Sequence, residues 1–170
     1  LEPARHYIAG DWVSGDSPMG DSVNPATYET LGRFHPGSAA LAEEAARVAR
    51  ETFFGTVWAQ SPRLRAQALF EIADRLEAAK DEIADLVVLE NGKIRAEAIG
   101  ETMGAISETR YYAGLARNIR GTMQETAPGN MSLFHREPAG VAAIIVPWNA
   151  PVTLLMRSLA PALAAGCTCV

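Results

Sequence analysis

The spacing of apolar residues in the first part of the chain predicts helices. Apolar side chains recur there every three to four residues, which is the repeat of one helix face. Ser38 and Ser61 each stand directly before such a stretch, and serine is a preferred residue at a helix N-terminus. Asp81 is a candidate start for a third helix that ends near Asn91, and a fourth helix is expected over about 95–117. We therefore expect four helices before the first buried strand.

Three other stretches predict short strands. Residues 7–13 place apolar pairs on both sides of an Ala-Gly-Asp turn, and 31–34 is a further short strand after the turn-rich segment 14–27. Residues 121–136 contain two mostly polar runs around a Pro-Gly-Asn turn, which predicts a hairpin. A solitary hairpin is only marginally stable in water, so this one needs another surface to pair with.

An unbroken apolar run over residues 141–146 ends at Pro147, two residues before Asn149. Such a run predicts a strand buried on both faces of a parallel sheet. With a helix expected over about 152–165 and a second strand from Thr168, the run completes a βαβ unit. Ligands of open α/β sheets bind just beyond the carboxyl ends of such strands, so the turn after residue 146 is a candidate site.

Asn149 is the polar, uncharged side chain of that turn. Its carboxamide can donate a hydrogen bond without carrying charge, which suits an oxyanion that forms only during a reaction. Pro147 and Pro151 restrict the backbone on either side and would aim this donor in advance. Two alternatives stay open: Asn149 closes a turn with its own backbone, and Trp148 merely fills the end of the sheet.

Composition and charge exclude several classes of protein. The chain has 170 residues, 48% of them hydrophobic and 21% charged, and a formal net charge of −5 without a block of like charges. Phosphate backbones need clustered lysine and arginine, so no nucleic-acid partner is expected. No apolar stretch approaches the roughly 20 residues that span a bilayer, and the N-terminus lacks the apolar core of a signal peptide. We therefore expect a cytoplasmic protein without a membrane partner.

The two cysteines, Cys167 and Cys169, are expected to be buried thiols. A bond between positions so close would be strained, and no further cysteine or histidine stands nearby to complete a metal site. We therefore predict no disulfide and no metal. Neither a G-x-G-x-x-G fingerprint nor a P-loop occurs in the chain, so those two motifs identify no nucleotide site.

Seven motifs along the chain resemble those of the aldehyde dehydrogenase superfamily, in that family's order. Two lie around the turn and in the helix that follows it, and five lie upstream. They are Tyr7-Ile8-Ala9-Gly10-Asp11-Trp12-Val13, Asn24-Pro25-Ala26-Thr27, Glu90-Asn91-Gly92-Lys93, Arg110-Tyr111-Tyr112-Ala113-Gly114, Arg136-Glu137-Pro138-x-Gly140-Val141, Pro147-Trp148-Asn149-x-Pro151 and Leu159-Ala160-Pro161-Ala162-Leu163-Ala164-Ala165-Gly166. Cys167 departs from the pattern, because the family usually has asparagine there.

The resemblance implies an α/β fold, doubly wound and Rossmann-like. Residues 1–120 and 137–170 would form the incomplete NAD(P)-binding domain, with 137–170 as its first βαβ unit, truncated. Residues 121–136 would be the hairpin of a small β oligomerisation arm, whose exposed edge pairs with a neighbouring subunit. A dimer or tetramer is the implied partner state. The chain would be the N-terminal portion of the enzyme.

The resemblance also implies a chemistry. In that family a cysteine thiolate attacks an aldehyde to give a thiohemiacetal, hydride passes to the nicotinamide, and water activated by a glutamate releases the acid. Asn149 matches the oxyanion donor. The nucleophile and the glutamate lie beyond Val170, so this portion alone is expected to be inactive. The cofactor would be NAD, with NADP left open, held by the turn residues Ile145, Val146, Pro147, Trp148 and Asn149.

Gly104, Leu154 and Arg157 would line the aldehyde tunnel by the same resemblance. Arg157 stands where an aromatic residue is frequent and would favour an aldehyde with a polar or anionic tail, unless it pairs with an acid on a neighbouring helix. Two rival functions stay open. One is a non-catalytic scaffold or binding relative, and the other is an acylating enzyme that passes the thioester to coenzyme A or a reductase that works on an acyl phosphate.

Overall fold

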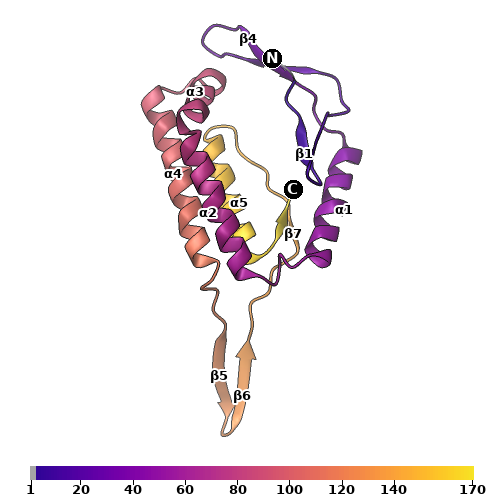
Figure 1. Ribbon diagram of the computed structural model, residues 1–170, viewed down its shortest axis with the longest axis vertical. Coiled ribbons are helices and arrows are strands. Elements are labelled where there is room, and N and C mark those ends of the chain that lie inside the picture. Colours follow the sequence, from indigo (N-terminus) through magenta and orange to yellow (C-terminus); the bar gives the residue numbers. More distant parts are fainter. Residues whose placement is uncertain (1–2) are drawn as a thin grey trace.

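A computed structural model describes residues 3–170. The N-terminal segment that lacks the apolar core of a signal peptide begins with two residues outside this range. The N-terminal part contains two antiparallel hairpins, the first beside α1 and the second at the end of the molecule (Figure 1). Strands β1 (His6–Ile8) and β2 (Asp11–Val13) form the first hairpin, as predicted, and β3 (Gly20–Val23) and β4 (Thr30–Phe34) form the second. Strand β3 was wrongly assigned to turns, because its sequence Gly-Asp-Ser-Val carries no apolar alternation.

Four helices follow, in the predicted order: α1 (Ala39–Gly55), α2 (Pro62–Ala78), α3 (Lys80–Asn91) and α4 (Arg95–Leu115). Ser38 and Ser61 cap α1 and α2 through their side-chain oxygens, as expected. Gly92, with a φ of 77°, ends α3 in the left-handed conformation. Asp81 does not cap α3, because the cap position is Ala79, two residues earlier, which leaves Asp81 in the first helical turn.

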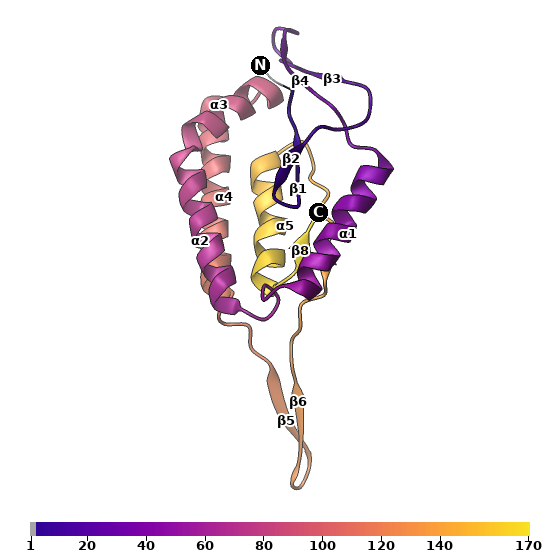
Figure 2. The same cartoon turned by 45° about the vertical axis from the view of Figure 1, so that its right-hand side comes forward.

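Strands β5 (Thr122–Ala127) and β6 (Asn130–Phe134) form the predicted hairpin, and it projects away from the helices (Figures 1 and 2). Its turn uses Gly129 at a φ of 77°. Nearly all of its side chains are exposed.

The last part of the chain is a βαβ unit with helices on both of its faces. Strands β7 (Val141–Ala142) and β8 (Thr168–Cys169) are parallel and are joined by helix α5 (Pro151–Ala165). Helix α1 contacts the pair from one side and α5 from the other, so the two strands lie between them (Figure 2). Helices α2 and α4 pack behind α5. This layering is the start of a doubly wound fold.

The predicted strand 141–146 is shorter than expected. Only its first two residues are in β7, and one further hydrogen bond, from the Ile144 amide to the carbonyl of Val170 at 2.8 Å, continues the pairing. Ile145 is 94% exposed, so the run is not buried on both faces at its exit end. Among residues 3–170, β8 is the sole strand that pairs with β7.

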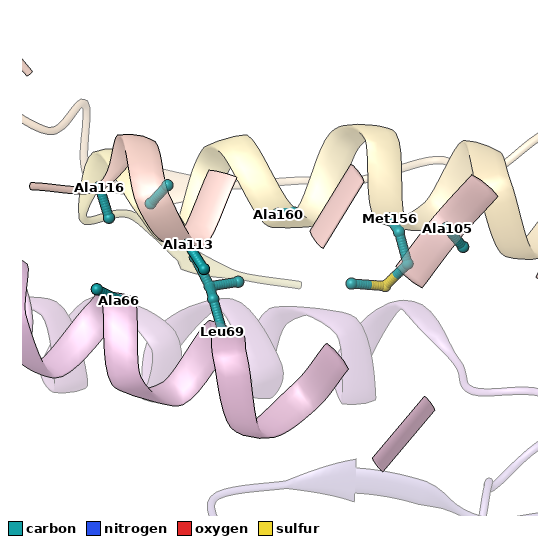
Figure 3. Packing of buried hydrophobic residues seen from close by; sticks show 8 residues of the cluster. Ala66, Leu69, Ala105, Ala113, Ala116, Met156 and Ala160 are labelled. Carbon is teal, nitrogen blue, oxygen red and sulfur yellow. The ribbon is translucent and has the colours of Figure 1, made fainter. Parts of the chain in front are cut away.

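Small side chains dominate the core where α2, α4 and α5 meet (Figure 3). Alanine lets helix backbones approach closely, and Leu69 and Met156 fill the larger spaces. The buried cluster consists of Ala66, Leu69, Ala105, Ala113, Ala116, Met156, Ala160 and Ala164. Within residues 3–170 no helix is both long and apolar enough to cross a membrane.

Candidate active site

The turn between β7 and α5 brings the sequence-predicted residues to the surface. Trp148 is 82% exposed, so among residues 3–170 it does not fill the end of the sheet. Pro147 and Asn149 are exposed as well, and Val146 is half-buried. The turn therefore presents an aromatic ring and a carboxamide side by side in sequence, both open to an outside group.

The carboxamide of Asn149 makes no hydrogen bond to any described residue. The second alternative, a turn closed by the Asn149 side chain on its own backbone, therefore has no such bond to support it. Asn149 also lines none of three cavities found among residues 3–170. The cavity of about 770 Å³ lies elsewhere, between the β1–β2 hairpin, α1 and Val170. Asn149 is thus a free donor on an open surface of this chain.

Glu101 of α4 occupies the N-terminus of α5, a feature that the sequence did not reveal. Its Oε1 accepts hydrogen bonds from the amides of Val152, at 2.8 Å, and Thr153, at 3.4 Å. The hydroxyl of Thr153 donates back to the Glu101 carbonyl at 2.9 Å. The Glu101 side chain is only 5% exposed, and the ammonium of Lys93, 19% exposed, pairs with Oε2. A carboxylate already satisfies these amides, so the N-terminus of α5 is not open to an anionic ligand.

Asn91 makes a second contact to the turn. Its Nδ2 donates to the carbonyl oxygen of Trp148 at 2.7 Å. Asn91 belongs to a quoted motif, but nothing in the spacing of that motif indicated a contact with a residue 57 positions further on. The candidate donor, Asn149, therefore lies between two points that side chains of other elements hold in place.

The three candidate substrate residues lie on α4 and α5. Gly104 is exposed on α4, and a Cβ placed there would stand 3.7 Å from the hydroxyl of Thr153, the neighbour of Leu154. Leu154 is half-buried and Arg157 is exposed one turn further along α5. Arg157 forms no ion pair with any carboxylate among residues 3–170, so nothing in this part of the protein supports the alternative of a structural ion pair.

Neither cysteine has the environment of a nucleophile. Cys167 is buried and Cys169 is half-buried, and both are free thiols. Burial, with a smaller contribution from Cys167, raises the pKa of Cys169 to about 11. A thiol with that pKa is protonated at neutral pH, as expected of a small apolar side chain rather than a reactive one.

Comparison with known proteins matches residues 12–170 to the Aldehyde dehydrogenase family. The NADP+ succinate-semialdehyde dehydrogenase of Saccharomyces cerevisiae is 39% identical over 165 residues, 96% of this chain and 33% of that protein. The alpha-ketoglutarate semialdehyde dehydrogenase of Haloferax volcanii is 35% identical over 175 residues, 99% of this chain and 36% of that protein.

Solved structures agree in fold. A betaine aldehyde dehydrogenase variant from Staphylococcus aureus, in complex with NAD+, superposes with a TM-score of 0.92 and 32% identity over 97% of this chain and 34% of that chain. For the NAD-dependent aldehyde dehydrogenase from Sinorhizobium meliloti the TM-score is 0.93, with 31% identity over 99% and 34%.

These matches confirm the predicted family and the predicted incomplete, Rossmann-like α/β fold. The chain spans about a third of the length of the curated relatives it matches. A family match over residues 12–170, joined to a relative 39% identical across nearly the whole chain, leaves one conclusion: this chain belongs to the aldehyde dehydrogenase family.

Proposed function

We propose that the whole protein oxidises an aldehyde to a carboxylic acid with NAD(P)+, and that Asn149 is its oxyanion donor. The observation that carries this proposal is the unpaired, exposed carboxamide of Asn149 in the turn between β7 and α5, in a chain of the aldehyde dehydrogenase family. In this proposal residues 1–120 and 137–170 belong to the cofactor-binding domain. The opposite wall of the active site, with the nucleophilic cysteine and the base, comes from the part of the relatives' length that this chain does not span.

The carboxamide would act when the aldehyde carbon becomes tetrahedral. Attack by a thiolate moves the carbonyl π electrons onto oxygen, and the Asn149 N–H group donates to that oxygen while its charge develops. A neutral donor suits this step, because it stabilises the oxyanion without holding an anionic ground state as a fixed cation would. Bound NAD(P)+ would accept the hydride from the tetrahedral carbon.

The exposed apolar side chains of Ile145 and Trp148 fit a cofactor that brings an apolar or aromatic face to this turn. Val146 and Pro147 complete the stretch proposed to contact it. Because Glu101 already holds the amides of Val152 and Thr153, the cofactor's phosphates would be bound by groups other than the N-terminus of α5. Relatives include one named for NADP+ and one solved with NAD+, so both cofactors are within the proposal.

Replacing Asn149 tests the proposal. In the whole protein, Asn149→Ala should lower kcat by about 10²- to 10³-fold, the usual cost of losing one oxyanion donor. The measurement is the rate of NAD(P)H formation at saturating aldehyde and cofactor. An unchanged kcat in a folded Asn149→Ala protein contradicts the role of Asn149, and no NAD(P)H formation by the unaltered protein with any aldehyde contradicts the function.

The substrate we propose is an aldehyde with an anionic tail. Arg157 is exposed and has no carboxylate partner among the described residues, and it shares the α5 face with Leu154 across from Gly104. Two relatives act, by name, on succinate semialdehyde and alpha-ketoglutarate semialdehyde, both of which carry a carboxylate. A guanidinium can bind such a carboxylate through two hydrogen bonds.

Two aldehydes of the same chain length decide this point. The whole protein should have a higher kcat/KM for succinate semialdehyde than for butanal, and Arg157→Met should reduce that preference by about 10- to 100-fold. Arg157→Lys, which keeps the charge but not the planar fork, should retain part of the preference. Equal kcat/KM values for the two aldehydes in the unaltered protein would refute the anionic tail.

We also propose that the hairpin 121–136 joins subunits into a dimer or tetramer. Met123 and Leu133 are paired across the hairpin and are 65% and 74% exposed, which is costly for apolar side chains that meet no partner. Replacing both by aspartate should reduce the mass of the whole protein in light scattering, whereas Gln124→Glu on the polar face should not. A mass unchanged by the double replacement would contradict the role of this hairpin in assembly.

A cytoplasmic location is part of the same proposal, since free thiols suit a reducing compartment.

A further inference from the structure

We infer that Glu101, supported by Lys93, is a positioning residue that holds Asn149 in its working orientation from outside the turn. This inference rests on the proposed oxyanion role of Asn149. Glu101 does not touch the turn's reactive group. It acts on the backbone that follows, three residues further along the chain.

Helix α5 does not cap its own N-terminus. The cap position is Ala150, whose side chain has no acceptor, and the first turn of α5 contains no acidic residue. The amides of Val152 and Thr153 would be left without partners in a half-buried position. The carboxylate of Glu101 accepts from both, and the hydroxyl of Thr153 closes the contact in the other direction. Glu101 of α4 therefore caps the N-terminus of α5 from outside the helix.

Lys93 offsets the cost of burying the Glu101 carboxylate. A carboxylate only 5% exposed is costly to bury alone, and the Lys93 ammonium on Oε2 offsets that charge. The partial positive charge at the N-terminus of α5 adds to the same effect on Oε1. Both oxygens of Glu101 are thus satisfied, so its side chain has one well-determined position.

The other side of the turn is fixed as well. The amide group of Asn91 holds the Trp148 carbonyl, which is the peptide group that enters Asn149. Pro147 lies just before this pair of contacts and Pro151 lies between them, and each restricts its own φ. Between the two held points the adjustable backbone torsions are those of Asn149 and Ala150 and the ψ of Pro151, so displacement of α5 would change the direction of the carboxamide.

A double-mutant cycle in the whole protein separates positioning from general support of the fold. The variants are Glu101→Ala, Asn149→Ala and the pair. Glu101→Ala should lower kcat by about 10- to 100-fold with little change in the aldehyde KM, because a donor misplaced by about 1 Å loses transition-state contact. In the Asn149→Ala background the same change should have almost no further effect, since the donor is already gone.

Two controls accompany the cycle. Glu97→Ala removes an exposed carboxylate one turn earlier on α4 and should leave kcat unchanged. Glu101→Gln combined with Lys93→Met keeps an acceptor oxygen for the Val152 amide and removes both charges together. It should recover most of the activity lost in Glu101→Ala, and it remains informative if Glu101→Ala fails to fold.

Hydrogen exchange gives a readout that needs no turnover. In peptides covering residues 148–155, the amides of Val152 and Thr153 should exchange faster in Glu101→Ala than in the unaltered protein, while those of the β5–β6 hairpin should not change. Unchanged exchange over 148–155 overturns the inference even in an active enzyme. The inference is also overturned if Glu101→Ala lowers kcat by the same factor with Asn149 present and with Asn149→Ala. In that case Asn149→Ala alone still slows turnover, and the proposed function survives. If Asn149→Ala has no effect, the proposed role of Asn149 fails and the inference fails with it.

Discussion

Arg65 on α2 is predicted to be a major stabilising residue of this chain. It is 4% exposed and forms no ion pair with a carboxylate among the described residues; it instead donates to backbone carbonyls. Its Nε binds the Ala164 carbonyl at 2.9 Å, and its Nη1 binds those of Trp58 at 3.0 Å and Ala59 at 2.8 Å. These carbonyls belong to the last turn of α5 and to the loop between α1 and α2. Arg65 therefore joins three elements through one guanidinium.

The magnitude follows from these contacts. A hydrogen bond to a charged group contributes about 1.5–3 kcal/mol, so three bonds at the lower end amount to about 4–5 kcal/mol. Burial opposes this, since it is the main cause that lowers the pKa of Arg65 below its usual value. Allowing for that penalty and for the lost packing of the methylene stem, Arg65→Met should reduce the free energy of unfolding by about 3 kcal/mol.

The assay is hydrogen exchange of α2 and α5 peptides over a urea series, which measures the free energy of opening this region within the whole protein. Arg65→Lys keeps the charge but cannot reach all three carbonyls, and about half of the loss is expected. Arg63→Met on the exposed face of the same helix is the matched control and should stay within about 0.5 kcal/mol. A loss from Arg65→Met below about 1 kcal/mol, or equal to the control, would refute the reasoning.

Three smaller predictions concern other contacts. Gly166 has a φ of 103°, and a Cβ there would stand 3.2 Å from the Arg65 guanidinium and 3.3 Å from the Ala59 carbonyl, so Gly166→Ala should cost about 1–3 kcal/mol in the same urea assay; a neutral change would contradict it. Hydrogen bonds from the side chain and amide of Ser38 lower the pKa of Asp16, so Asp16→Asn should destabilise α1 at pH 7. The difference should fade as the pH falls below the ordinary pKa of an aspartate and through the lowered one; a pH-independent difference would be inconsistent. Cys169, with a pKa of about 11, should resist iodoacetamide at pH 8 and react only as the pH approaches 11, as followed by peptide mass spectrometry. Rapid labelling at pH 8 would show that its thiol is not protected.

The helices could be predicted from sequence because their signals are local. Ser38 and Ser61 cap the helices that follow them, and Gly92 ends α3, through bonds within four residues of chain. The hairpin around Gly129 was predictable for the same reason, since a turn fixes its own register. Strand β3 was not, because pairing with β4 stabilises it and its own composition does not.

Some residues of the candidate site could likewise be predicted from sequence, and others could not. Asn149 could be selected from sequence, because an apolar run and two prolines mark its place in the chain. Glu101 could not, since it stands on an ordinary helix face and its partners are 51 and 52 residues away. The exposure of Trp148 was also beyond sequence analysis, because an apolar run does not show how far its neighbouring strand extends.

Helix α5 is held at both ends by charges that belong to other helices, and each sign matches the helix dipole. It has no acidic residue in its first turn and no basic residue in its last. Glu101 supplies the negative charge at the N-terminus and Arg65 the positive charge at the C-terminus. The two ends should nevertheless respond differently to mutation, because Asn149 lies next to only one of them. The relevant quantity is the kcat of the protein with Asn149 divided by the kcat of its Asn149→Ala variant. Loss of Arg65 should reduce stability and leave this ratio unchanged, whereas loss of Glu101 should bring it close to one. If both substitutions lowered this kcat ratio equally, α5 would be moving as one rigid body, and the positioning of Asn149 would be a property of the whole helix.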